Sequence, residues 1–148
     1  MYFVNRSDIE KKLHFIDTLW AEVQSKETFS TNLEMLGLER LTHMMIEATL
    51  DVGNHMIDGF IMRDPGSYHD IIDILIDEKV IPTEHEASYK QLIDLRQMLV
   101  QDYLSVDHDK IKDVLFTHKE NLIQFSTYVK TYLDNELGVA NAFSNEES

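Results

Sequence analysis

The stretch Arg96-Gln97-Met98-Leu99-Val100-Gln101-Asp102-Tyr103 places an arginine, two amides, an acid and a phenol inside an apolar pattern of helical spacing. At about 100° per residue, Arg96 and Tyr103 would end within about 20° of each other on a continuous helix. Gln101 would lie about 140° from Arg96. A helix that needed only a buried face would not carry these side chains. This signature stretch, residues 96–103, therefore predicts a functional face with a guanidinium and a phenol side by side.

The residues around the signature stretch indicate an all-α protein. Glycine and proline are scarce, at five and two, and long segments carry apolar residues at three- and four-residue spacing. We therefore predict an antiparallel helical bundle of four long helices and one short helix. A chain of 148 residues with 43% hydrophobic content suits one domain. We expect that domain to cover residues 1–143 and a disordered tail to cover residues 144–148.

The first half of the chain predicts two long helices. The first begins at an N-cap, Ser7, and its apolar stripe consists of Ile9, Leu13, Ile16, Trp20 and Val23. The second runs from about Thr31 through Phe60, with apolar contacts from Leu33, Leu41, Met45, Val52, Met56 and Phe60. Arg63-Asp64-Pro65-Gly66-Ser67 then forms the clearest turn pattern in the sequence.

The second half predicts one short and two long helices. Tyr68 to Lys79 forms the short one, closed by Pro82, with Ile71, Ile72, Leu75 and Ile76 facing inward. Thr83 and Glu86 make a capping-box pattern that opens a fourth helix, whose apolar residues are Leu92, Ile93, Met98 and Leu99. After a polar break from Ser105 to Asp109, a last helix carries Ile111, Leu115, Leu122, Phe125, Val129 and Tyr132 and ends at Gly138.

Composition restricts the possible functions. The absence of cysteine excludes disulfides, thiolate nucleophiles and cysteine-based metal centres. No apolar run is long enough for a membrane span and no signal peptide is evident, so we expect a cytoplasmic protein that does not enter a membrane. Thirteen basic against twenty-seven acidic residues give a formal charge of −14, which opposes long-range capture of RNA. The acidic surface indicates either a solvated exterior or a basic partner.

A polar face runs along the second predicted helix. Arg40, Glu47 and Asn54 recur every seven residues, and His43, Asp51 and His55 lie beside them. This face is either solvated or part of a site. In the second case Glu47 and Asp51 would pair with Arg96 and fix the direction of its guanidinium.

The same polar face offers a metal-ligand ladder of His43, Glu47, Asp51 and His55 as a further alternative. Bundle di-metal sites need Glu-x-x-His, whereas Glu39 and His43 are spaced one residue too far apart. We therefore predict no metal and no other cofactor. The remaining histidines occur singly and are predicted to be surface residues: His14, His69, His85, His108 and His118.

The signature stretch resembles that of the HEPN superfamily, in particular the HepT-like toxin ribonucleases, whose motif is R-x-x-x-x-H-x-Y. The chain has R-x-x-x-x-Q-x-Y, with Arg96 and Tyr103 in place and Gln101 where the family has histidine. Glu47, Asp51 and Asn54 match polar positions of HepT-like relatives, and the turn at residues 64–68 and Asp107 add to the resemblance. It implies a homodimeric bundle whose signature helices face each other across a cleft.

The resemblance also implies an activity and partners. Active relatives cleave RNA without a metal ion: the arginine assists at the phosphate, and the histidine handles protons for attack by the 2′-hydroxyl. HepT-like toxins pair with a nucleotidyltransferase antitoxin that adenylylates the signature tyrosine, here Tyr103. The residues implied at the site are Arg96, Gln101 and Tyr103, with Glu47, Asp51, Asn54 and Gln97 in support.

Gln101 departs from this pattern at the residue that transfers protons. A side-chain amide donates and accepts hydrogen bonds but does not titrate near neutral pH. Loss of general acid-base help typically lowers a rate by ~10² to 10⁴. Gln97 also replaces the asparagine that often follows the family's arginine. We therefore expect RNA cleavage to be weak or lost, with His108 as a candidate substitute for the missing histidine.

Three hypotheses remain open from the sequence. The first is a HepT-like protein derived from a toxin ribonuclease. The second is a non-catalytic dimeric module that binds a nucleotidyltransferase or another basic protein, in which Arg96, Gln101 and Tyr103 form only a dimer seam. The third is a metal-carboxylate bundle that uses the ladder on the second helix.

Overall fold

The fold is a bundle of α-helices, seen here in a computed structural model that describes residues 2–26 and 28–147, with side chains described as far as Gly138. The helices are α1 (Arg6–Ser25), α2 (Asn32–Gly59), α3 (Tyr68–Asp77), α4 (Glu86–Val100), α5 (His108–Thr117), α6 (Lys119–Leu122) and α7 (Phe125–Glu147). Two short 3-10 turns, η1 (Thr83–His85) and η2 (Tyr103–Ser105), flank α4. The predicted all-α class is confirmed.

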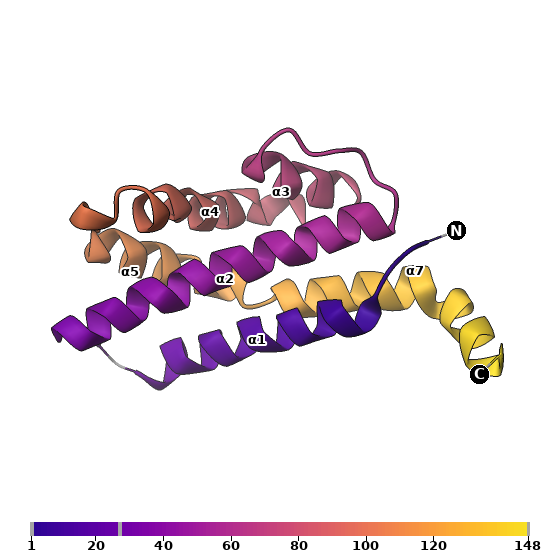
Figure 1. Ribbon diagram of the computed structural model, residues 1–148, viewed down its shortest axis with the longest axis horizontal. Coiled ribbons are helices and arrows are strands. Elements are labelled where there is room, and N and C mark those ends of the chain that lie inside the picture. Colours follow the sequence, from indigo (N-terminus) through magenta and orange to yellow (C-terminus); the bar gives the residue numbers. More distant parts are fainter. Residues whose placement is uncertain (1, 27, 148) are drawn as a thin grey trace.

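Helix α2 is the centre of the bundle. It packs against α1 on one side and against α3, α4 and α5 on the other, and α7 packs along α1. Neighbouring long helices run in opposite directions, as Figure 1 shows for α1 with α2 and for α1 with α7. Helix α2 is therefore in a position to bring polar side chains against the signature helix α4.

The predicted apolar stripes form the core, with one exception. All five residues of the α1 stripe are buried, as are Met45, Val52 and Met56 of α2. Leu33 was predicted to make apolar contacts but is 79% exposed. The buried stripe of α2 passes through Leu38, and Leu33 lies five residues earlier, about 140° away around the helix. An apolar residue off the stripe is left in solvent.

Two predicted helix starts are wrong. The N-cap of α1 is Asn5, not Ser7, since the Asn5 side chain accepts a hydrogen bond of 3.1 Å from the backbone N–H of Asp8. Thr83 and Glu86 do not form a capping box: Thr83 lies in η1, and α4 begins at Glu86. The Glu86 carboxylate instead binds Lys90 Nζ at 2.7 Å, one turn along α4.

The single long last helix that we predicted is divided into α5, α6 and α7. There are two breaks, and the second lies between Leu122 of α6 and Phe125 of α7. The first falls at His118, whose ring nitrogens are 2.8 Å from Ser88 Oγ and 3.0 Å from Gln91 Oε1, both on α4. Asn121 donates to the same Ser88 hydroxyl at 2.9 Å. These contacts with α4 stabilise the break at His118. Apolar spacing along one segment does not reveal them.

Helix α7 extends beyond its predicted end. Gly138 lies inside α7, which continues to Glu147, and so it is not the C-cap. The predicted disorder of residues 144–148 stays a prediction, since their side chains and all of Ser148 lie outside the described residues. No helix within residues 2–26 and 28–147 is long and apolar enough to cross a lipid bilayer.

Candidate functional site

Arg96 lies in the last part of α4 and is held by contacts from two other helices. Its Nε donates a hydrogen bond of 2.6 Å to Glu47 Oε1 on α2. Its guanidinium carbon lies 4.7 Å from the ring centre of Tyr68, the first residue of α3. The hydrogen bond to the Glu47 carboxylate raises the pKa of the Arg96 guanidinium above its ordinary value. The guanidinium is thus a permanent, oriented positive charge.

The Arg96 side chain forms one wall of an open hollow of about 390 Å³ between the start of α3 and the last turns of α4. We refer to it as the Arg96 hollow. Its lining residues are Ser67, Tyr68, His69, Ile93, Asp94, Arg96, Gln97 and Gln101. A cation, an aromatic ring and several hydrogen-bonding groups therefore face one solvent-filled space.

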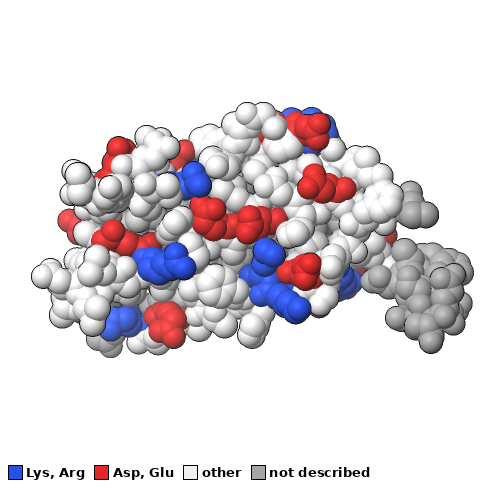
Figure 2. Space-filling view, viewed as in Figure 1, with Lys and Arg blue, Asp and Glu red and all other residues white. Residues whose placement is uncertain are grey.

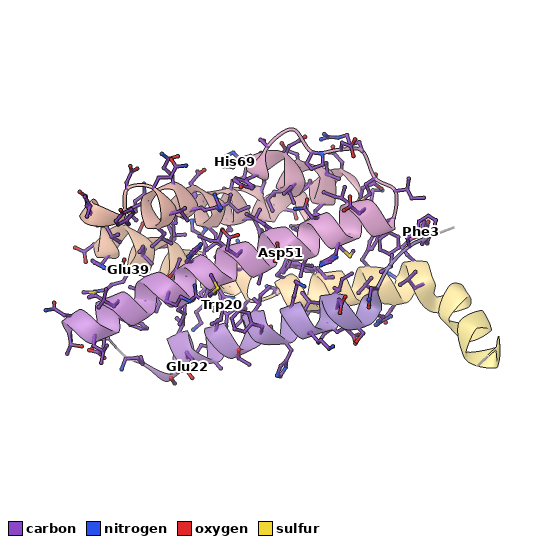
Figure 3. All side chains as sticks on the ribbon, viewed as in Figure 1. Phe3, Trp20, Glu22, Glu39, Asp51 and His69 are labelled. Carbon is purple, nitrogen blue, oxygen red and sulfur yellow. The ribbon has the colours of Figure 1, made fainter. Side chains whose placement is uncertain are left out.

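The predicted pairing of helix-two carboxylates with Arg96 holds for Glu47 only. Asp51 is exposed, and neither it nor the exposed Asn54 has a hydrogen-bond partner among the described residues. Figure 3 shows Asp51 midway along α2. Gln97 donates to Gln101 Oε1 at 3.0 Å, so these two amides bind each other at the edge of the Arg96 hollow.

Arg96 and Tyr103 do not lie on one helical stripe, which corrects the geometry predicted for the signature stretch. Helix α4 ends at Val100, Gln101 is its C-cap, and Tyr103 lies in η2 with 65% of its surface exposed. Tyr103 lines a separate shallow hollow that Gln101 also borders. Further along, Asp107 caps α5, and its backbone N–H donates a hydrogen bond of 3.1 Å to Met98 Sδ.

The histidines also differ from the prediction of solitary surface residues. His69 Nε2 lies 2.5 Å from Asp94 Oδ1, and both residues line the Arg96 hollow. His108, the candidate substitute for the missing histidine, instead binds Glu39 on α2 at 2.9 Å and does not line this hollow. Figure 3 shows His69 at the beginning of α3 and Glu39 towards the N-terminal end of α2.

Sequence reasoning therefore missed Tyr68, His69 and Asp94 as residues of the site. Their only local signal is that Tyr68 and His69 follow the cap at Ser67, whose side chain accepts from the Asp70 N–H at 3.0 Å. Their proximity to Arg96 depends on how the first turn of α3 packs against α4, about 25 residues further along the chain. Spacing within one helix carries no information on that contact.

The ladder on α2 does not assemble a metal site. Within the described residues, no three histidine, aspartate or glutamate side chains come close enough to hold one ion. His43 Nε2 is 3.5 Å from Glu47 Oε1, and Glu47 is already bound to Arg96. Of the ladder residues, His43 and Glu47 contact each other, and no side-chain contact joins them to Asp51 or His55 within the described residues.

The surface around these helices carries both signs of charge. Figure 2 shows acidic and basic side chains interspersed on the face that it presents, without a continuous basic stripe. The chain as a whole carries a formal charge of −14. Contact with a polyanion would have to depend on local cations such as Arg96 rather than on long-range attraction.

Comparisons with known proteins agree with this arrangement. A family model described as "Ribonuclease HepT-like" matches residues 9–129. A Bacillus subtilis (strain 168) protein named "Putative RNase YutE" is 46% identical over 143 residues, which cover 97% of this chain and 99% of that protein. A solved structure of YutE from Bacillus subtilis, described as a cytosolic protein of unknown function, superposes with a TM-score of 0.91 at 46% identity, covering 93% of this chain and 96% of that one. The chain therefore belongs to the HepT-like ribonuclease family of the HEPN superfamily.

Proposed function

We propose that this protein is a homodimeric RNA endonuclease that works without a metal ion and is slowed by the presence of Gln101. The observation that carries the proposal is the fixed guanidinium of Arg96 at the wall of an open hollow. Family membership and the name given to the Bacillus subtilis relative support RNA as the substrate class. In this proposal Arg96 binds the phosphate at which the chain is cut.

The contacts of Arg96 leave it suited to a phosphate. Glu47 accepts from Nε alone, and within the described residues no protein group accepts from either Nη atom. Two terminal nitrogens therefore remain to form the paired hydrogen bonds that a guanidinium makes with two phosphate oxygens. The cation–π contact with Tyr68 further restricts the guanidinium, so that little rotational freedom is lost on binding.

The dimer is proposed from the surface next to the signature stretch. Val100, the last residue of α4, and Tyr103 and Leu104 of η2 are 36%, 65% and 91% exposed. Three exposed apolar or aromatic side chains within five residues are costly to leave in water, and a second copy would cover them across a two-fold axis. Such a contact would bring the two Gln101 residues, and with them the two Arg96 hollows, towards each other.

The first test is cleavage of labelled RNA in the presence of EDTA. We expect slow cleavage by the native protein and loss of it in Arg96→Ala, because the phosphate would lose its cationic ligand. Arg6→Ala is the control, since Arg6 is also an arginine that binds carboxylates, those of Glu10 and Asp134, but it lies on α1. Equal cleavage by the native protein and Arg96→Ala would contradict the proposed role of Arg96 and indicate a contaminating nuclease.

The second test restores the family residue. Gln101→His places a titrating imidazole at the edge of the Arg96 hollow, and we expect cleavage to rise by roughly tenfold or more. If neither the native protein nor Gln101→His cleaves RNA, the ribonuclease proposal fails. Growth inhibition caused by expression of Gln101→His, but not of the native protein, would identify the native chain as an inactivated toxin.

A second candidate function is favoured by the exposure of Tyr103 and by the charge of the chain. A phenol that is 65% exposed can be reached by a nucleotidyltransferase, and a formal charge of −14 suits a basic partner. In this alternative the dimer is the non-catalytic member, or the modified toxin, of a cytoplasmic toxin-antitoxin pair. The phenolic oxygen would attack the α-phosphate of ATP and release pyrophosphate.

Co-purification with a nucleotidyltransferase encoded beside the gene, followed by intact mass measurement, tests this alternative. We expect an added AMP group that is absent from Tyr103→Phe. An unmodified protein that does not bind this partner would contradict it.

A further inference from the structure

The Arg96 hollow holds a histidine and a carboxylate that the family motif does not include. His69 from α3 and Asp94 from α4 meet at 2.5 Å, and Asp94 lies two residues before Arg96. Both are half-exposed, at 44% and 57%, so the pair faces the solvent space that a bound molecule would enter. His69 is the second residue of α3 and follows Tyr68, the residue that packs on Arg96.

The hydrogen bond determines which nitrogen of His69 can accept a proton. An ionised carboxylate only accepts hydrogen bonds, so the Asp94 side chain requires the proton of a neutral imidazole to be on Nε2. The Nδ1 atom then carries the free electron pair. Among the described residues, no protein donor is bonded to it.

The other side chains of the hollow are poorly suited to proton transfer at neutral pH. Of its eight lining residues, only His69 belongs to a type that ordinarily titrates there. Gln97 and Gln101 are amides that bind each other. Ile93 and Ser67 have no titrating group in this range, and tyrosine, arginine and aspartate ordinarily titrate well above or well below it.

We propose that His69 is the general base of RNA cleavage in the Arg96 hollow, in place of the histidine that Gln101 replaces. The inference rests on the proposed ribonuclease function. The Nδ1 atom of His69 takes the proton of the ribose 2′-hydroxyl as that oxygen forms a bond to phosphorus. The bond from phosphorus to the 5′-oxygen breaks, and the leaving oxygen takes a proton from water. The products are a 2′,3′-cyclic phosphate and a 5′-hydroxyl, and His69 then releases its proton to solvent.

Arg96 and Asp94 complete this arrangement. Arg96 would hold the phosphate through its free Nη atoms, in the same hollow that the base lines. Asp94 is a positioning residue, because it acts through the ring of His69 and not on the RNA. It keeps the proton on Nε2 and stabilises the imidazolium formed during the step, as carboxylates that face a catalytic histidine do.

The test measures cleavage of a mixed-sequence pool of 5′-labelled single-stranded RNA in EDTA by the full-length protein. We expect His69→Gln to lower the single-turnover rate by ~10² to 10⁴, because the amide cannot accept the 2′-hydroxyl proton. The rate of the native protein should fall at acid pH, where an imidazole base is protonated, and the residual rate of His69→Gln should lack this fall. Asp94→Asn should lower the rate less than His69→Gln and leave RNA affinity unchanged.

The matched control is His108→Gln. His108 also binds a carboxylate, that of Glu39, but outside the Arg96 hollow, so its loss should leave the rate within about twofold. Thermal unfolding of each variant shows whether the fold is retained; the half-exposed His69 and Asp94 should tolerate substitution.

The outcomes separate the inference from the proposed function. Cleavage that depends on Arg96 but is equal in the native protein and His69→Gln would overturn the role of His69 and leave the ribonuclease proposal intact. Equal losses in His69→Gln and His108→Gln would also overturn it. A native protein that cleaves no RNA would overturn both.

Discussion

At the scale of single residues, Arg96 is held by two contacts of different physical kinds. The hydrogen bond to Glu47 is charge-assisted and directional, and the cation–π contact with Tyr68 holds the guanidinium over the ring. Arg96 and Glu47 are 24% and 32% exposed, so solvent screens the pair only in part. A partly buried ion pair of this kind orients a side chain more than it stabilises the fold.

Glu47→Ala should lower the free energy of unfolding by about 1 to 2 kcal/mol, because Arg96 loses its charged acceptor. Asp51→Ala is the control on the same helix. Asp51 is exposed and without a described partner, so its loss should change the free energy by no more than about 0.5 kcal/mol. Urea denaturation of both variants provides the comparison, and equal losses would argue against the Arg96 pair.

At the scale of elements, helix α2 shows how closely its neighbours approach. A Cβ atom built on Gly53 would lie 2.5 Å from Ile71 Cγ2 of α3, whereas one built on Gly37 of the same helix meets nothing within 4 Å. Gly53 therefore allows α3 to pack against α2, and thereby positions Tyr68 and His69 beside α4. Gly37 has no such role.

The two glycines should respond in opposite directions to alanine. Gly53→Ala gains about 1 kcal/mol of helix propensity but loses about 1 to 3 kcal/mol to overpacking against buried Ile71, so a net loss is expected. Gly37→Ala should raise stability by about 0.5 to 1 kcal/mol. Chemical denaturation decides the sign of each change, and a stabilised Gly53→Ala would show that α2 and α3 are not in close contact.

The turn before α3 makes a second prediction at this scale, on pH. Paired hydrogen bonds from Arg63, of 2.7 and 2.8 Å, lower the pKa of Asp70 to about 2. An aspartate of the unfolded chain titrates near pH ~3.9. The stabilisation from Asp70 is therefore fully present above pH ~4 and is lost as the pH falls towards 2.

Asp70→Asn should remove this part of the acid dependence. Between pH ~4 and pH ~2 its denaturation midpoint should fall less steeply than that of the native protein. Asp77→Asn is the control, because Asp77 is 69% exposed and lies 3.8 Å from Arg63. A native slope retained in Asp70→Asn would contradict the assignment of this pair.

At the scale of the whole molecule, the proposed dimer connects the local site to a composite cleft. The exposed residues that follow α4 provide the apolar surface, and the Arg96 hollow lies beside them, with Gln101 bordering both. The acidic net charge makes local cations and a partner more important for RNA binding than the field of the whole protein.

Leu104→Arg should convert the dimer into a monomer, because a charge would replace the most exposed apolar side chain of that surface. Light scattering during size-exclusion chromatography measures the mass. Phe3→Arg changes another exposed apolar residue, 71% exposed, near the N-terminus and should leave the dimer intact. A native protein that is monomeric at all concentrations would contradict the dimer.

Local features of the chain were predictable because they depend on contacts within one or two helical turns. The buried stripe of α1, the long span of α2 and the turn before α3 all follow from apolar spacing and turn residues close in the sequence. Glu47 was predicted as a partner of Arg96, 49 residues away, from the polar face of its helix together with the family resemblance.

Packing between helices determined what the sequence pattern left open. The end of α4 at Val100 separates Tyr103 from Arg96, and the contact of α3 with α4 unites His69 and Asp94. The break between α5 and α6 follows in the same way from contacts of His118 with α4. A periodic pattern specifies which face of a helix is buried but not where along its neighbour each residue lies, because that register results from the fit of side chains contributed by distant segments.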